Sequence, residues 1–125
     1  IYVICYSDHD LITVCDLDGN LKYNVYGPKW NSEKTRKSYL NGALFCGDKL
    51  FTTYNGEISF IHGERGLETS KPTKFLVFNT DGDYLQTLET GYRIGAFCYD
   101  RENNRLIMSL YDEIQFAYLD LDGLI

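Results

Sequence analysis

Apolar residues along this chain of 125 residues recur at every second position or in short continuous runs. Alternation predicts half-buried β-strands, and continuous runs are typical of strands packed on both faces. Three such runs, LITVCDL (11–17), KFLVFNT (74–80) and QFAYLDL (115–121), lead directly into the dipeptide Asp-Gly. Asp-Gly after an apolar run is a strong hairpin signal, because glycine supplies the positive φ that tight turns need. The pattern predicts an all-β protein, and no stretch indicates a helix.

The three runs belong to an internal repeat. Aligned on Gly19, Gly82 and Gly123, the position three residues earlier holds Asp16, Asn79 and Asp120. Short polar side chains in this place cap turns, so we expect all three to bind backbone N–H groups. The position seven residues before each glycine holds Ile12, Phe75 and Phe116, and the position five before holds Val14, Val77 and Tyr118.

The repeat extends upstream and predicts four strands per unit, A to D. Residues 2–8 align without gaps on 106–112 as strand B, and 49–54 match them in the middle unit. Strand A is predicted at 41–46 and 94–98, strand C before each Asp-Gly and strand D after it. Gly82 and Gly123 are 41 residues apart, which suits a β-propeller blade of about 40–45 residues. The middle unit is longer and carries an insertion at about 55–73.

These observations predict about three four-stranded antiparallel sheets that are blades of a six-bladed β-propeller. A generic antiparallel sandwich with accidental Asp-Gly turns is the lesser alternative. Residues 1–125 form one partial propeller domain in this interpretation, with blade remnants at 1–27, 39–91 and 92–125. We expect the chain to be the C-terminal part of a ring of roughly 250–400 residues. An open arc exposes apolar sheet faces, so we expect the fragment to self-associate, with two three-blade halves closing one ring.

The pattern of an apolar run, an Asp-Gly turn and a further apolar strand resembles six-bladed propellers of the TolB-like and NHL-like type. The resemblance is carried by residues 16–21, 79–85 and 120–124, and is closest to lipoproteins of unknown function in gut anaerobes. It implies a location in the periplasm or at the cell surface, with any lipid anchor on a preceding segment. It also implies a non-catalytic role as a binding module or scaffold that engages a protein, peptide or glycan. The alternative is a hydrolase or lyase, similar to the lactonases among NHL-like propellers, with its site in the central channel and mostly on blades outside this chain.

Composition and charge limit the classes of partner and bound group that we expect. The net charge is −6, which disfavours nucleic-acid binding, and no apolar run reaches the ~20 residues of a membrane span. No cofactor motif is present. Four widely spaced cysteines without a C-x-x-C pair do not indicate zinc.

The first hairpin can be put in register on paper. A four-residue loop at 7–10 pairs Cys5 with Ile12 and Tyr2 with Cys15, which places the two cysteines on opposite sides of the sheet. We therefore expect Cys5, Cys15, Cys46 and Cys98 to be reduced thiols.

Three clusters could carry chemistry. Asp8-His9-Asp10 has metal-capable side chains, but neighbouring strand residues diverge, and we interpret the cluster as a turn without a metal. His62, Glu64, Arg65 and Glu68 in the insertion could perform acid–base chemistry, but a solvated loop is the favoured interpretation. Asp112-Glu113 is a carboxylate pair on a turn, where hydration is more common than catalysis.

The repeat predicts which side of the molecule is functional. B–C turns and D-to-A links emerge on one side, where the long and charge-rich segments gather; the A–B and C–D turns on the other side are short. Long loops free of packing duty often hold binding residues. We predict that a partner is bound on this side through Trp30, Arg36, His62, Arg65 and Arg93, with Asp8 and Asp112 nearer the channel. The alternative is that these loops only protect edges or contact further blades.

Overall fold

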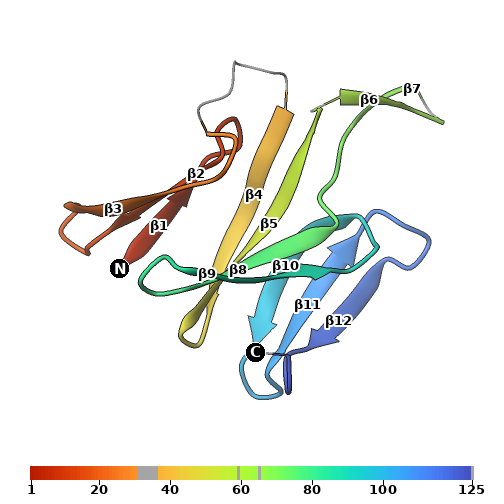
Figure 1. Cartoon of the computed structure of the whole chain (residues 1–125). Coiled ribbons are helices and arrows are strands. Elements are labelled where there is room, and N and C mark those ends of the chain that lie inside the picture. Colours follow the sequence, from red (N-terminus) through yellow and green to blue (C-terminus); the bar gives the residue numbers. More distant parts are fainter. Residues whose placement is uncertain (31–36, 59, 65, 125) are drawn as a thin grey trace.

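The computed structural model describes residues 1–30, 37–58, 60–64 and 66–124, and these residues form strands and connecting turns without a helix (Figure 1). The first strands are β1 (Tyr2–Cys5), β2 (Leu11–Cys15), β3 (Leu21–Tyr26), β4 (Lys37–Cys46), β5 (Lys49–Ile58) and β6 (Phe60–Gly63). They are followed by β7 (Gly66–Thr69), β8 (Lys74–Asn79), β9 (Tyr84–Glu89), β10 (Ile94–Asp100), β11 (Arg105–Leu110) and β12 (Phe116–Asp120). The all-β prediction is confirmed, and the described residues contain no helix that could cross a membrane.

The strands form three main antiparallel sheets, consistent with propeller-like blades. Their orders are β1-β2-β3, β4-β5-β8-β9 and β10-β11-β12. The middle sheet has the predicted order A to D. The first sheet consists of strands B, C and D, and the third of strands A, B and C. We call them the first, middle and third sheets.

The register predicted for the first hairpin is confirmed. Cys5 pairs with Ile12, Tyr2 pairs with Cys15, and the Tyr6 N–H donates to the Leu11 carbonyl at 3.3 Å. All four cysteines are free thiols. Burial raises the pKa of Cys46 to about 12 and also raises that of Cys5, so both thiols stay protonated at neutral pH.

The predicted turn caps are also confirmed. Asp16 Oδ1 accepts hydrogen bonds from the N–H groups of Asp18 and Asn20, both at 2.9 Å. Asn79 Oδ1 does the same for Asp81 at 2.9 Å and Asp83 at 3.0 Å. In the last unit, Asp120 Oδ1 accepts from the Asp122 N–H at 3.0 Å. The glycine of each turn has a φ of 80–89°, so the repeat in the sequence is a repeat in backbone geometry.

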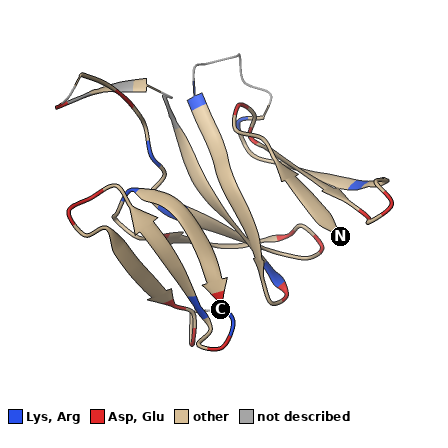
Figure 2. Cartoon of the chain, turned by 180° about the vertical axis from the view of Figure 1, so that it is seen from behind, with Lys and Arg blue, Asp and Glu red and all other residues tan. Residues whose placement is uncertain are grey.

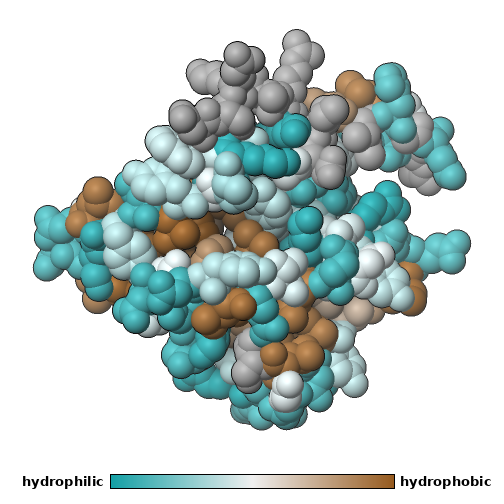
Figure 3. Space-filling model, in the orientation of Figure 1, coloured by the Kyte–Doolittle hydropathy of each residue, from teal (hydrophilic) through white to brown (hydrophobic). Residues whose placement is uncertain are grey.

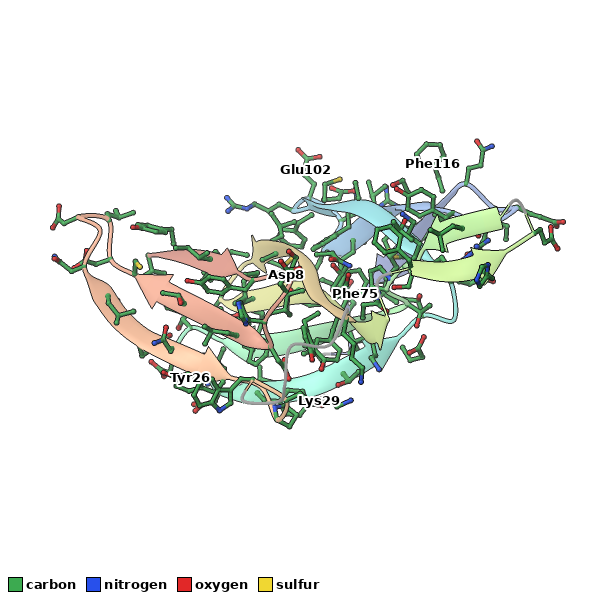
Figure 4. All side chains as sticks on the ribbon, turned by 90° about the horizontal axis from the view of Figure 1, so that it is seen from above. Asp8, Tyr26, Lys29, Phe75, Glu102 and Phe116 are labelled. Atoms are coloured by element: carbon green, nitrogen blue, oxygen red, sulfur yellow. The ribbon has the colours of Figure 1, made fainter. Side chains whose placement is uncertain are left out.

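The middle sheet is buried on both faces, which explains its continuous apolar runs. One face packs against the first sheet in a cluster that contains Ile12, Leu50 and Phe78. The other face packs against the third sheet through Phe51 and Phe75, and the Phe75 ring centroid lies 5.0 Å from that of Phe97. Adjacent residues Leu50 and Phe51 therefore serve different interfaces, as strand alternation requires. Figure 4 shows Phe75 among the sheets, seen from above.

Part of the insertion forms a two-stranded hairpin, because β6 and β7 pair from Phe60–Thr69 to Gly63–Gly66. The prediction of a solvated loop is therefore wrong for the backbone of His62 and Glu68, which lie on these strands. Glu64 lies in the turn between the strands, and Arg65 lies outside the described residues. The long link expected between Gly27 and Tyr39 is also shorter, since β4 already begins at Lys37. The first residues of β4 pair with the last residues of β5, so strands A and B of this blade are longer than the 41–46 and 49–54 predicted from the repeat.

Charged residues lie mainly at turns and strand ends, and the middles of the strands are largely free of them (Figure 2). Because charges avoid the sheet interiors, the side chains available for polar recognition are concentrated on the two turn-bearing sides of the molecule.

Candidate binding groove on the loop face

The B–C turns and the D-to-A links emerge on one side of the molecule, which we call the loop face (Figure 1). It comprises the described residues of 6–10, 27–37, 59–73, 90–93 and 111–115. The opposite turn face carries the short turns at 16–20, 47–48, 80–83 and 101–104.

A hollow of about 460 Å³ opens on the loop face, and we call it the loop-face groove. All three sheets and the segment of the insertion hairpin contribute to it. It is lined by Asp8, Ser38, Asn41, Phe60, Thr69, Ser70, Lys71, Pro72, Ile94, Gly95 and Tyr111. Strands β4 and β10, which are strand A of their sheets, form its inner wall. A surface assembled from three repeats in this way is the type of concavity that propellers and other repeat proteins use for binding.

The groove contains a cation held against an aromatic ring. Lys71 Nζ lies 4.4 Å from the centroid of the Tyr111 ring and 2.6 Å from Thr69 Oγ1, to which it donates a hydrogen bond. This cation–π contact joins the segment after β7 to the turn after β11. A second bond fixes the base of the same segment, because Asn55 Nδ2 donates to Ser70 Oγ at 2.7 Å.

Two exposed aromatic residues line the groove. Phe60 and Tyr111 are 55% and 53% exposed, so both offer apolar surface to a partner. Asp8 is exposed and brings a carboxylate to the rim from the β1–β2 turn. The groove therefore combines aromatic surface with one group of each charge, an arrangement suited to polar recognition with apolar anchoring.

Of the residues singled out from the sequence, Asp8 lines the groove. Trp30 is half exposed and packs against Tyr26 at the end of the first sheet, with the rings tilted by 49° and their centroids 4.6 Å apart. His62 is exposed on β6. Arg93 and Asp112 form an ion pair with each other and do not line the groove. Arg36 and Arg65 lie outside the described residues.

Arg93 and Asp112 are joined by two hydrogen bonds. The Arg93 N–H donates to Asp112 Oδ2 at 2.7 Å, and Arg93 Nε donates to Asp112 Oδ1 at 3.0 Å. The backbone N–H of Arg93, followed by its guanidinium, lowers the pKa of the Asp112 carboxyl. The pair closes the β9–β10 link onto the β11–β12 turn.

The Asp8-His9-Asp10 cluster diverges, as its position on a turn predicts. Asp8 lines the loop-face groove, whereas the buried Asp10 carboxylate accepts the Lys29 N–H at 3.0 Å. His9 packs edge-on against Tyr6, with ring centroids 6.2 Å apart. Within the described ranges, no group of three His, Cys, Asp or Glu residues is placed to hold a metal ion.

Several groove residues were not anticipated from the sequence, chiefly Asn41, Phe60, Lys71 and Tyr111. A usable signal did exist for Asn41, because strand A lines the centre of a propeller and a polar residue there is a candidate channel group. Lys71 and Tyr111 gave no local signal, since their contact depends on how the insertion folds back over the third sheet.

Comparison with known proteins adds no family, because neither the family models nor the curated proteins contain a match to this chain.

Proposed function

We propose that this chain is a non-catalytic binding or scaffold module built from β-propeller blades, and that the loop-face groove binds a segment of a partner protein or peptide. The observation that carries the proposal is the convergence of three sheets and the insertion on one hollow of about 460 Å³. The hollow falls within the range of about 300–1,000 Å³ in which ligand sites are usually found.

The chemistry of the groove favours a polypeptide. Phe60 and Tyr111 can take an apolar side chain of the partner, and Lys71 and Asp8 can take an acidic and a basic one. The Asn41 side-chain amide can both donate to and accept from a partner's peptide groups. Aromatic rings with amides and hydroxyls also bind sugars, so the experiment has to distinguish a peptide ligand from a glycan ligand.

The cell-envelope location is a separate proposal and is supported by the resemblance to TolB-like and NHL-like lipoproteins. Fractionation of the source cells tests it: recovery with periplasmic or surface proteins is expected, and recovery with cytosolic markers contradicts it.

The binding proposal is tested by selecting peptides from a random display library on the 125-residue chain. Selected peptides are then titrated against Lys71→Glu and Tyr111→Ala, with the double variant Arg101→Ala, Glu102→Ala on the turn face as the control. We expect a loss of roughly 10-fold or more in affinity for each groove variant, the usual effect of removing an interface anchor. The control should bind like the unmodified chain.

Equal loss in the control, or undiminished binding by both groove variants, contradicts the groove as the site. A parallel glycan array distinguishes the ligand class: glycan binding that depends on Lys71 and Tyr111, without peptide binding, overturns the choice of a polypeptide.

A further inference from the structure

The outer side of the third sheet carries an exposed and largely apolar face, which we call the C-terminal face. It is defined by Cys98, Ile107, Phe116 and Tyr118. Arg105 bounds it at one end, with its guanidinium 4.7 Å from the Tyr118 ring centroid and paired with Asp100. Cys98, Ile107 and Tyr118 form one row across the three strands, since Cys98 pairs with Ile107 and Ile107 with Tyr118. Phe116 is 71% exposed and Tyr118 63%, and Figure 4 shows Phe116 projecting from the outer edge of the molecule.

At the equivalent repeat positions of the other two sheets, the corresponding face is buried. Phe116 occupies the repeat position of Ile12 and Phe75, which are 3% and 0% exposed. Ile12 is buried against the middle sheet and Phe75 against the third, so in both cases the next sheet covers this position. Tyr118 corresponds in the same way to Val14 and Val77, both buried.

The outer side of the first sheet is the complementary half of the same interface, and we call it the N-terminal face. It is defined by Tyr2, Ile4 and Leu21, which are 40%, 41% and 60% exposed. Tyr2 occupies the repeat position of Leu50 and Leu106, which are 4% and 0% exposed and packed against the preceding sheet. This face therefore has the position, within the repeat, of a surface that accepts a preceding sheet.

We propose that the C-terminal face of one chain packs on the N-terminal face of a second copy, and that two copies close a ring of six sheets. The contact joins two different surfaces, so each copy uses both of its faces and two equal interfaces form around a two-fold axis. The contact repeats the packing that the middle sheet makes with its neighbours. Because the positions involved are those already buried twice within the chain, a second copy supplies a surface of matching shape and character.

Burial of these side chains drives the association. Removal of large apolar side chains such as Phe116 and Tyr118 from water is favourable in proportion to the apolar area covered.

The test is the mass of the 125-residue chain in solution, measured by sedimentation velocity over a wide range of concentrations. We expect a species of twice the chain mass of 14.4 kDa that dissociates on dilution. Phe116→Glu and Ile4→Glu are each expected to abolish it. Leu17→Glu is the control, since Leu17 is 83% exposed at a turn and belongs to neither face.

Mixing the two variants tests the head-to-tail geometry. Ile4→Glu retains an intact C-terminal face and Phe116→Glu an intact N-terminal face, so the mixture is expected to regain one interface and form a pair. Association of Ile4→Glu with itself instead indicates contact between two C-terminal faces and overturns the proposal. A monomer at all concentrations of the unmodified chain also overturns it and assigns the faces to another partner.

Alkylation of Cys98 gives a second readout that needs no variant. Cys98 is exposed in the single chain and lies within the C-terminal face, so its reaction rate is expected to fall as the chain concentration rises. A rate that is independent of concentration while the dimer forms places the contact elsewhere and contradicts the proposal.

Discussion

Arg93 and Asp112 close the third sheet's loops onto each other through a backbone and a side-chain hydrogen bond, with the Arg93 N–H 2.7 Å from Asp112 Oδ2. The pair was singled out from the sequence as a candidate for partner binding. Its geometry instead makes it a clasp between the β9–β10 link and the β11–β12 turn, which form part of the loop face.

The clasp predicts an acid sensitivity. The Asp112 pKa is lowered in the folded chain from its ordinary value of 3.8, so its contribution to stability is present above that value. The contribution is lost as the pH falls through the lower, folded pKa. Thermal unfolding followed from pH 6 to pH 2 should therefore show a smaller decline for Asp112→Asn than for the unmodified chain. Parallel declines contradict the clasp; Asp18→Asn, at an exposed turn, is the matched control.

The turn cap at Asn79 predicts a graded series of variants. Asn79→Ala removes the acceptor of two backbone N–H groups and is expected to cost about 1 kcal/mol of unfolding free energy. Asn79→Asp keeps the backbone acceptor but loses the bond from Asn79 Nδ2 to Asp83 Oδ2 and brings two carboxylates together. The double variant Asn79→Asp, Asp83→Asn reproduces the Asp16–Asn20 pair of the first turn and should be close to neutral. Urea unfolding measures all three variants. A double variant as unstable as the alanine variant contradicts the equivalence of the two turns.

A buried carboxylate lies directly over a glycine between the first and middle sheets. A Cβ added to Gly27 would lie 2.0 Å from Asp10 Cγ, and Asp10 Oδ2 also accepts from the Tyr54 hydroxyl at 3.5 Å. Burial, and then the Asp10 charge, raise the Tyr54 pKa to about 12, which keeps the hydroxyl a donor at neutral pH. The site borders an apolar hollow of about 350 Å³, visible between the two sheets in Figure 3.

We expect Gly27→Ala to destabilise the chain by about 1–3 kcal/mol, the usual range for overpacking. In Asp10→Ala the carboxylate is gone and the added methyl group fits, so the double variant should be more stable than the sum of the two single changes predicts. Additive effects of the two changes contradict this close contact. Denaturant unfolding of the unmodified chain, the two single variants and the double variant measures all four free energies of this double-mutant cycle.

The repeat predicts opposite sensitivities at equivalent positions. Phe75→Ala should cost about 3–5 kcal/mol because it empties a fully buried site between two sheets. Phe116→Ala, at the same repeat position, should stay within about 0.5 kcal/mol in the dissociated chain at high dilution. Similar losses at both positions contradict the assignment of Phe116 to an outer face.

Much of this fold is readable from local chemistry. Asp-Gly turns, their polar caps and the alternation of apolar residues are short-range signals, and they predicted the strand order of the middle sheet. A four-residue loop at 7–10 predicted the register of Cys5 with Ile12. The insertion was not predicted as a hairpin, because its pairing of Phe60 with Thr69 brackets a turn without an Asn-Gly or Asp-Gly signal.

The candidate site was less accessible to sequence reasoning. The contact between Lys71 and Tyr111 joins the segment after β7 to the turn after β11, and no spacing along the chain encodes it. Arg93 and Trp30 were selected for their charge and residue type. In the structure Arg93 forms an ion pair with Asp112, and Trp30 packs against Tyr26. The loop face could be inferred from the order of strands, but the groove within it required the packing of three sheets.

Hydroxyl-radical footprinting of the chain with a selected peptide compares the loop face and the turn face without any substitution. We expect Phe60 and Tyr111 to become protected on binding, while the exposed Leu17 on the turn face reacts as before. Protection at Leu17 with unchanged reactivity of Phe60 and Tyr111 would place the binding surface on the turn face and contradict binding in the loop-face groove.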